Sequence, residues 1–451
     1  MIFKCKKLLQ KDGWVNNAEV TTNSDGVITS INVGKDDPSS FTDYAIPGFQ
    51  NAHSHAFQYA MAGISENHST KNADDFWSWR NAMYKVALSV NPEQFEVIAA
   101  MLYSEMRRHG VTNVAEFHYL HHDKNGKPYN NLAEMGERLI SAAKNAGIGI
   151  TLIPIFYQKG GFGKPPEENQ CRFISSNVDD YSKLLEATEK ACNGYEYANC
   201  GIGIHSMRAV KPEDIIKIAN SYNQDIPFHI HISEQTAEVE DCKAYLGKRP
   251  VQWMLDNINL SERFHFVHAT HSNTTEISGL AKTKVNVVLC PTTEGNLGDG
   301  IFPLRKFQEA SGSWSIGTDS HISLNPFEEL RLLDYGQRLT THKRNTFVTK
   351  SNGNSGVNAI NQSQLAGRRA MNNFCEDYFE VGQPLNACLI SSNHPLIQLS
   401  SDENLLNTII YSSDETMQSG TIANGKLYEK EDFDVSIKNN FKKVLKELDV
   451  R

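Results

Sequence analysis

The chain has 451 residues, of which 44 are lysine or arginine and 53 are aspartate or glutamate, so its formal net charge is −9. This acidic balance excludes a nucleic acid or an anionic membrane as the default partner. Hydrophobic residues make up 39% and charged residues 22% of the sequence, which is typical of a soluble globular protein and not of a disordered one.

Three features of the sequence favour a cytoplasmic protein. Residues 1–7 include lysines where the apolar core of a signal peptide would lie. No run of 18 apolar residues is present, so we expect no membrane span. The eight cysteines are scattered without a Cys-x-x-Cys pair, which argues against a disulfide scaffold or a zinc ribbon.

The first 40 residues or so predict short strands, and from about residue 44 a pattern of apolar strand, loop and amphipathic helix repeats along the chain. Eight inner strands are predicted in this part, at 44–50, 111–117, 148–155, 200–204, 226–232, 263–268, 285–290 and 314–318. Strands that alternate with helices in this number predict an α/β protein with a (β/α)₈ TIM-type barrel. Its active site would lie at the C-terminal ends of the strands.

Short strands are also predicted near both chain ends, at 2–4, 18–20, 27–33, 387–390, 408–411 and 421–422, with a turn at Asn424-Gly425. We therefore expect the two ends to form one small β-sandwich domain around the barrel. The predicted division is 1–43 and 379–451 for the two parts of the small domain and 44–378 for the catalytic barrel. Two excursions, 56–90 and 156–178, interrupt the barrel pattern, and loops of such length are typically functional or mobile.

A pair of histidines follows the first predicted barrel strand. His53 and His55 are separated by one residue, and the alternation of an extended chain points both imidazoles the same way, as a shared metal ion requires. In a chain with 16 histidines such a pair arises by chance about as often as not, so two polar loop histidines are an equally good interpretation of the spacing alone. The position of the pair at a strand end favours the metal site.

Three further strand ends carry candidate ligands or acid–base groups. These residues are His229, His231 and Glu234 after the fifth predicted strand, His268 and His271 after the sixth, and Asp319 and His321 after the eighth. Alternation does not decide which histidine of the fifth strand faces a metal. Taken singly, each residue is more often structural, as a core histidine, a solvated loop acid or a helix-capping aspartate.

Taken together, these groups predict one catalytic metal ion at the rim of the barrel. Neutral imidazole and carboxylate suit zinc, which keeps an open position for water in catalytic sites. The same ligands also permit iron, cobalt or manganese. The fourth strand ends His205-Ser206-Met207-Arg208 and offers no lysine before Lys211, so a binuclear site bridged by a modified lysine is not expected.

Longer stretches around these residues form a distinctive pattern. They are 53–58 (HSHAFQ), 115–119 (AEFHY), 205–210 (HSMRAV), 229–235 (HIHISEQ), 290–300 (CPTTEGNLGDG) and 328–333 (EELRLL). The pattern resembles the amidohydrolase superfamily in its mononuclear deaminase branch and, within that branch, the formimidoylglutamate deiminases. The resemblance covers about 45–375 and, more loosely, the flanking β domain.

The resemblance implies roles for individual residues. One zinc ion per chain would be bound by His53, His55, His231 and Asp319. Glu234 and His268 would form the acid–base pair, and Asp319 would orient the attacking water. The substrate-binding residues would be Gln58, Arg80, Tyr119, His205 and Arg208. The resemblance leaves His229 a core or supporting role and His271 and His321 loop roles, and it also implies a homodimer.

The implied reaction is the hydrolysis of the formamidine of N-formimino-L-glutamate to N-formyl-L-glutamate and ammonia, a step of histidine degradation. An acidic protein that binds this small dicarboxylate needs local positive charge, and arginine offers a bidentate fork to a carboxylate. Arg80 and Arg208 are the candidates. Without the resemblance, a surface salt bridge is the plainer interpretation of Arg80 and an equally good one of Arg208. Arg172, in the second excursion, is a further arginine that could help, but it is not included among the predicted substrate-binding residues.

Two other functions stay open at this point. A deaminase of an aminated purine, pyrimidine or triazine ring fits the same scaffold, but a flat uncharged ring would need aromatic stacking and amide hydrogen bonds in place of two arginines. A catalytically silent barrel that serves as a scaffold would be expected to have lost some of the ligands, whereas every position is filled here.

Overall fold

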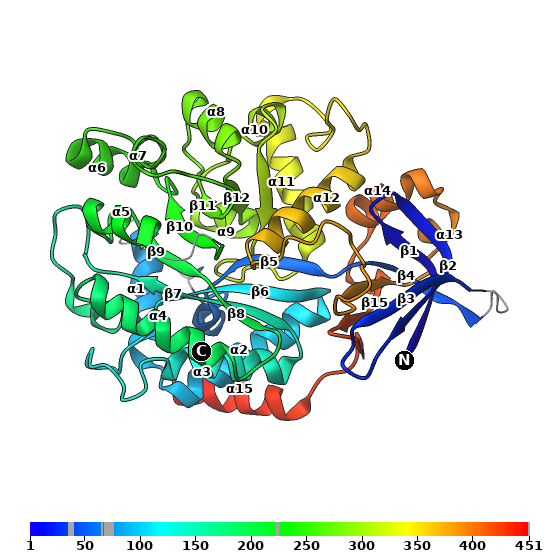
Figure 1. The fold of residues 1–451 in the computed structure, drawn as a ribbon, viewed down its shortest axis with the longest axis horizontal. Helices are drawn as coiled ribbons and strands as arrows, with labels where there is room; N and C mark the ends of the chain where they lie inside the picture. Colours follow the sequence, from blue (N-terminus) through cyan, green and yellow to red (C-terminus); the bar gives the residue numbers. More distant parts are fainter. Residues whose placement is uncertain (35–39, 65, 67–75, 222–224, 450–451) are drawn as a thin grey trace.

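Two β-sheets organise the protein (Figure 1). The computed structural model describes residues 1–34, 40–64, 66, 76–221 and 225–449. One sheet is a parallel barrel surrounded by helices, and the other is a mixed sheet built from both chain ends. No helix within the described ranges is long and apolar enough to cross a lipid bilayer.

Eight parallel strands of the described chain form the barrel. In chain order they are β5 (Phe49–Ser54), β6 (Val111–His118), β7 (Gly149–Phe156), β9 (Ile202–Ser206), β10 (Phe228–Ile232), β11 (Phe264–His268), β12 (Asn286–Leu289) and β13 (Ser313–Ile316); the short β8 (Ala198–Cys200) pairs with β7. Their order in space follows the chain, and the first and last strands meet at a parallel bridge between Ser54 and Asp319. The predicted (β/α)₈ barrel is confirmed.

The first barrel strand is misplaced in the prediction of 44–50. Residues 42–47 form β4 (Thr42–Pro47), which belongs to the second sheet, and the barrel begins only at Phe49. Gly48 lies between the two strands, and a Cβ there would lie 2.4 Å from the side chain of Thr112. Because apolar residues occur on both sides of this glycine, the hydrophobic pattern does not reveal that the chain passes from one sheet to the other.

Helices cover the outside of the barrel. They are α1 (Phe76–Ser89), α2 (Pro92–Arg108), α3 (Glu134–Ala146), α4 (Val178–Cys192), α5 (Pro212–Ser221), α6 (Thr236–Leu246), α7 (Pro250–Asn257), α8 (Thr274–Thr283), α9 (Pro291–Leu297), α10 (Leu304–Glu309), α11 (Pro326–Thr341) and α12 (Ser355–Arg369). Helix α2 shows how the sequence sets its bounds: Asn91 and Gln94 form a capping box, and buried Phe95, Ile98 and Leu102 recur at helical spacing. Helix α3 ends at Gly147, which has a left-handed φ of 79°.

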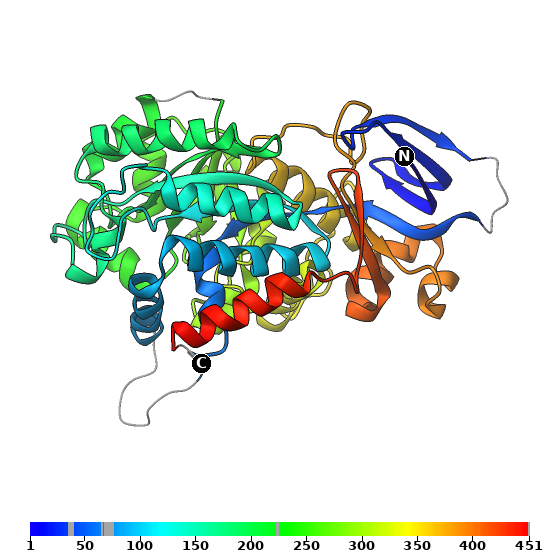
Figure 2. The same cartoon turned by 90° about the horizontal axis from the view of Figure 1, so that it is seen from below.

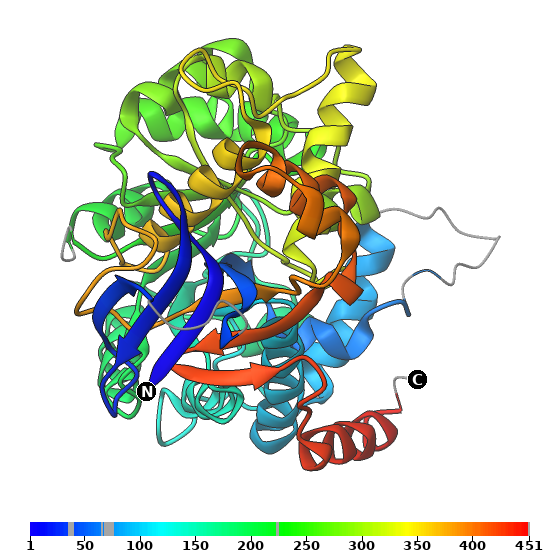
Figure 3. The same ribbon diagram turned by 90° about the vertical axis from the view of Figure 1, so that its right-hand side faces the viewer.

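The second sheet joins strands from the two ends of the chain. They are β1 (Ile2–Gln10), β2 (Gly13–Thr22), β3 (Ile28–Val33), β4, β14 (Ala387–Ile390), β15 (Gln418–Ala423) and β16 (Lys426–Glu429), in the order β16-β15-β14-β4-β1-β2-β3. Figure 3 faces this sheet and shows the blue N-terminal strands together with the orange and red C-terminal ones. The expected β unit from both chain ends is therefore present, with its strands in one continuous hydrogen-bonded order.

Three further helices lie in the C-terminal part of the chain: α13 (Pro395–Leu399), α14 (Asp402–Ser412) and α15 (Val435–Glu447). The strand predicted at 408–411 is wrong, because these residues lie in α14. Buried Leu405, Leu406, Ile409 and Ile410 form one apolar face of that helix, and the helical spacing outweighs the strand propensity of the local β-branched residues. Helix α15 returns from the sheet to the barrel and packs on α2 (Figure 2).

The two excursions pack against each other. The first contains the 3₁₀ turn η2 (Ala56–Met61) and α1, and the second contains η3 (Glu168–Phe173); a further turn, η4 (Glu415–Met417), precedes β15. Residues 65 and 67–75 of the first excursion lie outside the described ranges. Arg172 of η3 is fully buried and donates hydrogen bonds to the carbonyls of Ala87, Val90 and His122. Arg172 therefore ties η3 to the end of α1.

Candidate active site

Four side chains converge at the C-terminal ends of the barrel strands. His53 and His55 lie at the end of β5, His231 lies in β10, and Asp319 lies in the turn after β13. The Nε2 atoms of the three histidines are 3.0 to 3.3 Å from one another. Asp319 Oδ1 is 3.5 Å from His53 Nε2 and 3.2 Å from His55 Nε2. All four residues are buried.

These separations fit the ligands of one divalent metal ion. Ligands at the usual distances from a tetrahedral zinc ion lie about 3.3 Å apart. Nδ1 of His55 is 2.9 Å from the carbonyl of Phe117, and Nδ1 of His231 is 3.0 Å from the carbonyl of His205. A carbonyl only accepts, so both Nδ1 atoms carry the proton and both Nε2 lone pairs face the centre.

The electrostatics of the cluster also suit a cation. Burial lowers the pKa of His53 to about 3 and holds the pKa of His231 well below its usual value, so both imidazoles are neutral, which is the form that binds metal. Burial disfavours the ionised Asp319 carboxylate, but its close approach to the imidazoles of His53 and His55 holds its pKa well below the usual range. His53 and His231 thus offer neutral imidazoles, and Asp319 an anionic oxygen, to a divalent cation.

Closure of the barrel holds the ligands in place. The carbonyl of His53 accepts hydrogen bonds from the backbone N–H groups of Thr318 and Asp319 at 3.1 and 3.0 Å. The backbone N–H of His55 donates to the carbonyl of Asp319 at 3.3 Å. A Cβ at Gly317 would lie 2.8 Å from His53 Cβ, so the strands approach this closely only with glycine there. Asp319 itself has a left-handed φ of 49°, a strained conformation of the kind that gathers at functional sites.

Glu116, in β6, supports the His-x-His segment. Its carboxylate accepts hydrogen bonds from the Ser54 hydroxyl and the Ala56 backbone N–H, both at 2.6 Å, and from the Tyr103 hydroxyl at 3.0 Å. Burial raises the pKa of Glu116, and these donors oppose the rise. The bonds fix the residues on both sides of His55.

The two residues expected to form the acid–base pair lie next to the cluster. His268 Nε2 is 3.9 Å from Glu234 Oε1 and 3.6 Å from Asp319 Oδ2, and His268 Nδ1 is 3.2 Å from Glu294 Oε1. Burial opposes the charge of His268, but the three carboxylates together raise its pKa to about 10. Burial raises the pKa of Glu234, and the charge of His268 opposes that rise. The group can therefore hold and exchange protons beside the metal ligands.

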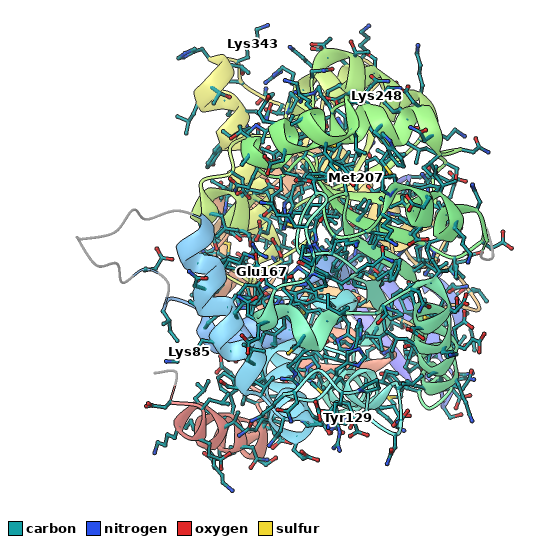
Figure 4. All side chains as sticks on the ribbon, turned by 90° about the vertical axis from the view of Figure 1, so that its left-hand side faces the viewer. Lys85, Tyr129, Glu167, Met207, Lys248 and Lys343 are labelled. Carbon is teal, nitrogen blue, oxygen red and sulfur yellow. The ribbon has the colours of Figure 1, made fainter. Side chains whose placement is uncertain are left out.

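A cavity of about 540 Å³ opens onto these residues. Of the residues predicted for the site, it is lined by Arg80, Tyr119, His205, Arg208, His231, Glu234, His268 and Asp319, and its aromatic lining includes Trp79, Tyr84, Tyr157 and Phe173. A larger outer cavity of about 1520 Å³ shares Arg80, Tyr84 and Arg208 with it and is also lined by Glu167, which Figure 4 shows beside α1. The two arginines stand where the inner cavity meets the outer one.

Four of the five predicted substrate-binding residues line this cavity, and Gln58 is not among its lining residues. The guanidinium of Arg208 makes no hydrogen bond and no close ion pair with any described residue, and the guanidinium of Arg80 lies 5.0 Å from the centre of the Tyr84 ring. Gln58 is buried behind the wall and donates a hydrogen bond to the Tyr119 hydroxyl at 3.0 Å. Gln58 therefore reaches the cavity only through Tyr119.

The other histidines named in the sequence analysis, His229, His271 and His321, lie outside the ligand cluster. His229 is fully buried, stacks on His265 with ring centres 4.6 Å apart, and its Nε2 is 2.9 Å from the carbonyl of Ala370, in agreement with a core role. His271 is half-buried in the turn after β11. His321 follows Asp319 in its turn but is buried, with Nδ1 3.0 Å from the Thr318 hydroxyl. The expected loop position of His321 is thus correct, whereas its side chain belongs to the interior.

Sequence reasoning missed two buried glutamates beside the site, Glu294 and Glu238. Glu294 lies in the stretch 290–300, and membership of that matching stretch was its only signal. Glu238 lies in the first turn of α6 and accepts a hydrogen bond from the backbone N–H of Glu234. A glutamate in the first turn of a helix is common as a cap, so its spacing gave no functional signal.

Comparisons with known proteins agree with this geometry. The model of the amidohydrolase family matches residues 44–355. The chain is 39% identical over 409 residues to formimidoylglutamate deiminase from Pseudomonas aeruginosa, a match that covers 90% of this chain and 89% of that protein. A crystal structure of an amidohydrolase from Brucella melitensis superposes with a TM-score of 0.89 at 37% identity and covers 99% of both chains.

A more distant structure, an adenosine deaminase from Xanthomonas campestris with bound zinc, shares the fold, with a TM-score of 0.81 at 19% identity over 100% of this chain and 98% of that one. The family model spans well over half of the sequence, and the Pseudomonas aeruginosa relative is similar along nearly the whole chain. The extent of these matches shows that the chain belongs to the amidohydrolase family.

Proposed function

We propose that this amidohydrolase hydrolyses the formamidine of N-formimino-L-glutamate and releases N-formyl-L-glutamate and ammonia. The observation that carries the proposal is that Arg80 and Arg208 line the same cavity as the metal-ligand cluster. Two carboxylates on a small substrate call for two cations, and arginine binds a carboxylate through paired N–H groups. The 39% identity to the deiminase from Pseudomonas aeruginosa supports the same substrate.

The residues present fit one zinc ion per chain. His53, His55, His231 and Asp319 would hold it, because their ligand atoms already have the separations of a tetrahedral site. When bound, the ion supplies Lewis acidity and lowers the pKa of a coordinated water to about 7.

The protein's own side chains would then manage protons and charge. His268, whose Nε2 lies 3.6 Å from Asp319 Oδ2, would help to orient the attacking water and would stabilise the tetrahedral centre that forms at the formamidine carbon. Asp319 Oδ2 would orient the attacking water and accept its proton. Glu234 would deliver a proton to the departing nitrogen, since ammonia leaves far more easily than an amide anion. Arg80 and Arg208 would fix the carboxylates during these steps.

A carbon NMR time course tests the proposal. Zinc-loaded protein would be incubated with N-formimino-L-glutamate labelled at the formimino carbon, and ammonia would be measured in parallel. We expect N-formylglutamate to form with an equal amount of ammonia. Formamide with glutamate would show that the other C–N bond breaks and would contradict the role of Glu234. No reaction with zinc bound would refute the substrate.

A second candidate follows from the aromatic lining of the cavity. Trp79, Tyr84, Tyr119, Tyr157 and Phe173 surround it, and such side chains can stack on an aminated heterocycle. Guanine and cytosine belong in the same assay as competing substrates. Ammonia release from either ring, faster than from formiminoglutamate, would favour this second function.

A further inference from the structure

Two buried glutamates stand four residues apart after β10. Glu234 lies in the turn that follows the strand, and Glu238 lies in the first turn of α6. The Oε2 atom of Glu238 accepts a hydrogen bond from the backbone N–H of Glu234 at 3.1 Å, and Glu238 is only 4% exposed. Glu238 touches neither the metal ligands nor the inner cavity, so the predicted roles of the site do not account for it.

An ordinary helix cap does not explain this bond. A glutamate at the third helical position usually accepts from the backbone N–H of the N-cap residue, and in α8 Glu276 does so with Asn273. The N-cap of α6 is Gln235, and Glu238 reaches past it to Glu234. Ser233, directly before Glu234, has a left-handed φ of 51°, so the segment that carries Glu234 is strained and needs to be held.

The surroundings of Glu238 explain how a buried carboxylate is kept there. Burial raises the pKa of Glu238 to about 7, and the guanidinium of Arg208 opposes that rise. In turn, Glu238 is the largest favourable charge for Arg208, which has no close ion pair with the described residues. Both residues line the outer cavity. Glu238 thus accepts a hydrogen bond from the backbone of Glu234 and interacts electrostatically with Arg208, which lies at the mouth of the cavity.

We propose that Glu238 is a positioning residue, whose carboxylate holds the segment 233–234 so that the side chain of Glu234 faces His268. The inference rests on the part that Glu234 plays in the proposed function. Without the bond from Glu238, the strained turn at Ser233 relaxes and the Glu234 carboxylate leaves its place beside His268. A misplacement of about 1 Å can cost about 100-fold in rate.

Two substitutions at one position separate this role from simple capping. Glu238→Ala removes the acceptor, and we expect kcat to fall by about 10- to 100-fold while KM changes by less than about threefold, because the lost alignment matters in the transition state. Glu238→Gln keeps an amide oxygen that can accept the same N–H, and we expect it to recover kcat to within about threefold of the wild type. Glu276→Ala is the matched control: it removes a buried cap in α8 and should lower the melting temperature with kcat unchanged.

Hydrogen exchange in the zinc-loaded protein without substrate gives an independent readout. The Glu234 amide should exchange faster in Glu238→Ala than in the wild type and should stay protected in Glu238→Gln. Unchanged exchange, unchanged kcat in Glu238→Ala, or no recovery in Glu238→Gln would each overturn the positioning role. The two proposals can fail separately. If the three proteins show the expected exchange pattern but the wild type does not hydrolyse formiminoglutamate, the proposed substrate is refuted and the exchange data still support the positioning role.

Discussion

Replacement of Arg208 by methionine should weaken the binding of a dicarboxylate without slowing the chemical step. The Arg208 guanidinium lines the inner cavity, and within the described ranges no side chain or carbonyl is hydrogen-bonded to it in place of the carboxylate it would bind. A hydrogen bond to a charged group contributes about 1.5–3 kcal/mol. At 1.4 kcal/mol for each factor of ten, the loss of one such bond corresponds to a rise in KM of about 10- to 150-fold.

The assay is steady-state ammonia release from N-formimino-L-glutamate by the zinc-loaded wild type, Arg208→Met and Arg208→Lys. Lysine keeps the charge but not the paired N–H groups, so its KM should lie between the other two. An analogue with one carboxylate fewer should be bound almost equally by the wild type and Arg208→Met if Arg208 binds that carboxylate. Arg138→Met is the control, because Arg138 pairs with Glu93 and Glu134 on the outside of the barrel.

Two results would refute the reasoning about Arg208. Unchanged KM and kcat in Arg208→Met would show that this arginine does not contact substrate. A fall in kcat with KM unchanged would show that it acts on the transition state and not on substrate binding.

Three further predictions concern the metal centre and the assembly. Glu234→Gln should retain zinc, measured by elemental analysis, but lose at least about 100-fold in kcat, and near-normal turnover would remove Glu234 from the mechanism. Glu116→Gln places N–H groups where the carboxylate accepted hydrogen bonds from Ser54 and Ala56. We therefore expect zinc affinity, measured by chelator competition, to fall about 10- to 100-fold. Equal affinity would contradict the supporting role of Glu116. We also propose a homodimer, so light scattering should give a mass twice that of one chain, and the mass of a single chain would contradict this.

The sequence was sufficient for the parts of the fold that follow from periodicity. The barrel strands after β5 follow an alternation of buried strand and helix, and buried parallel strands produce this pattern directly. The pattern is insufficient at Gly48, where two sheets share one apolar tract, and in α14, where β-branched residues lie on a helix. In both places contacts with distant parts of the chain decide the structure.

For the candidate site, the sequence was sufficient to predict which types of residue take part and at which strand ends they lie. Alternation orients His53 and His55 together, but it leaves His229 and His231 equivalent until the structure places His229 in the core against His265. Glu238 could not be found in this way, because its role depends on a hydrogen bond to one backbone N–H. Spacing along the sequence carries no information about such a bond.

The ligand cluster lies on the seam where the barrel closes, with consequences for assembly. His53 belongs to the first barrel strand, His55 directly follows it, and Asp319 follows the last strand. A bound ion is therefore a noncovalent cross-link between segments far apart in the chain, and it opposes the loop-closure entropy of the open form. A nascent chain that has emerged only as far as β10 carries the three histidines without the carboxylate, so tight metal binding reports the completion of the barrel.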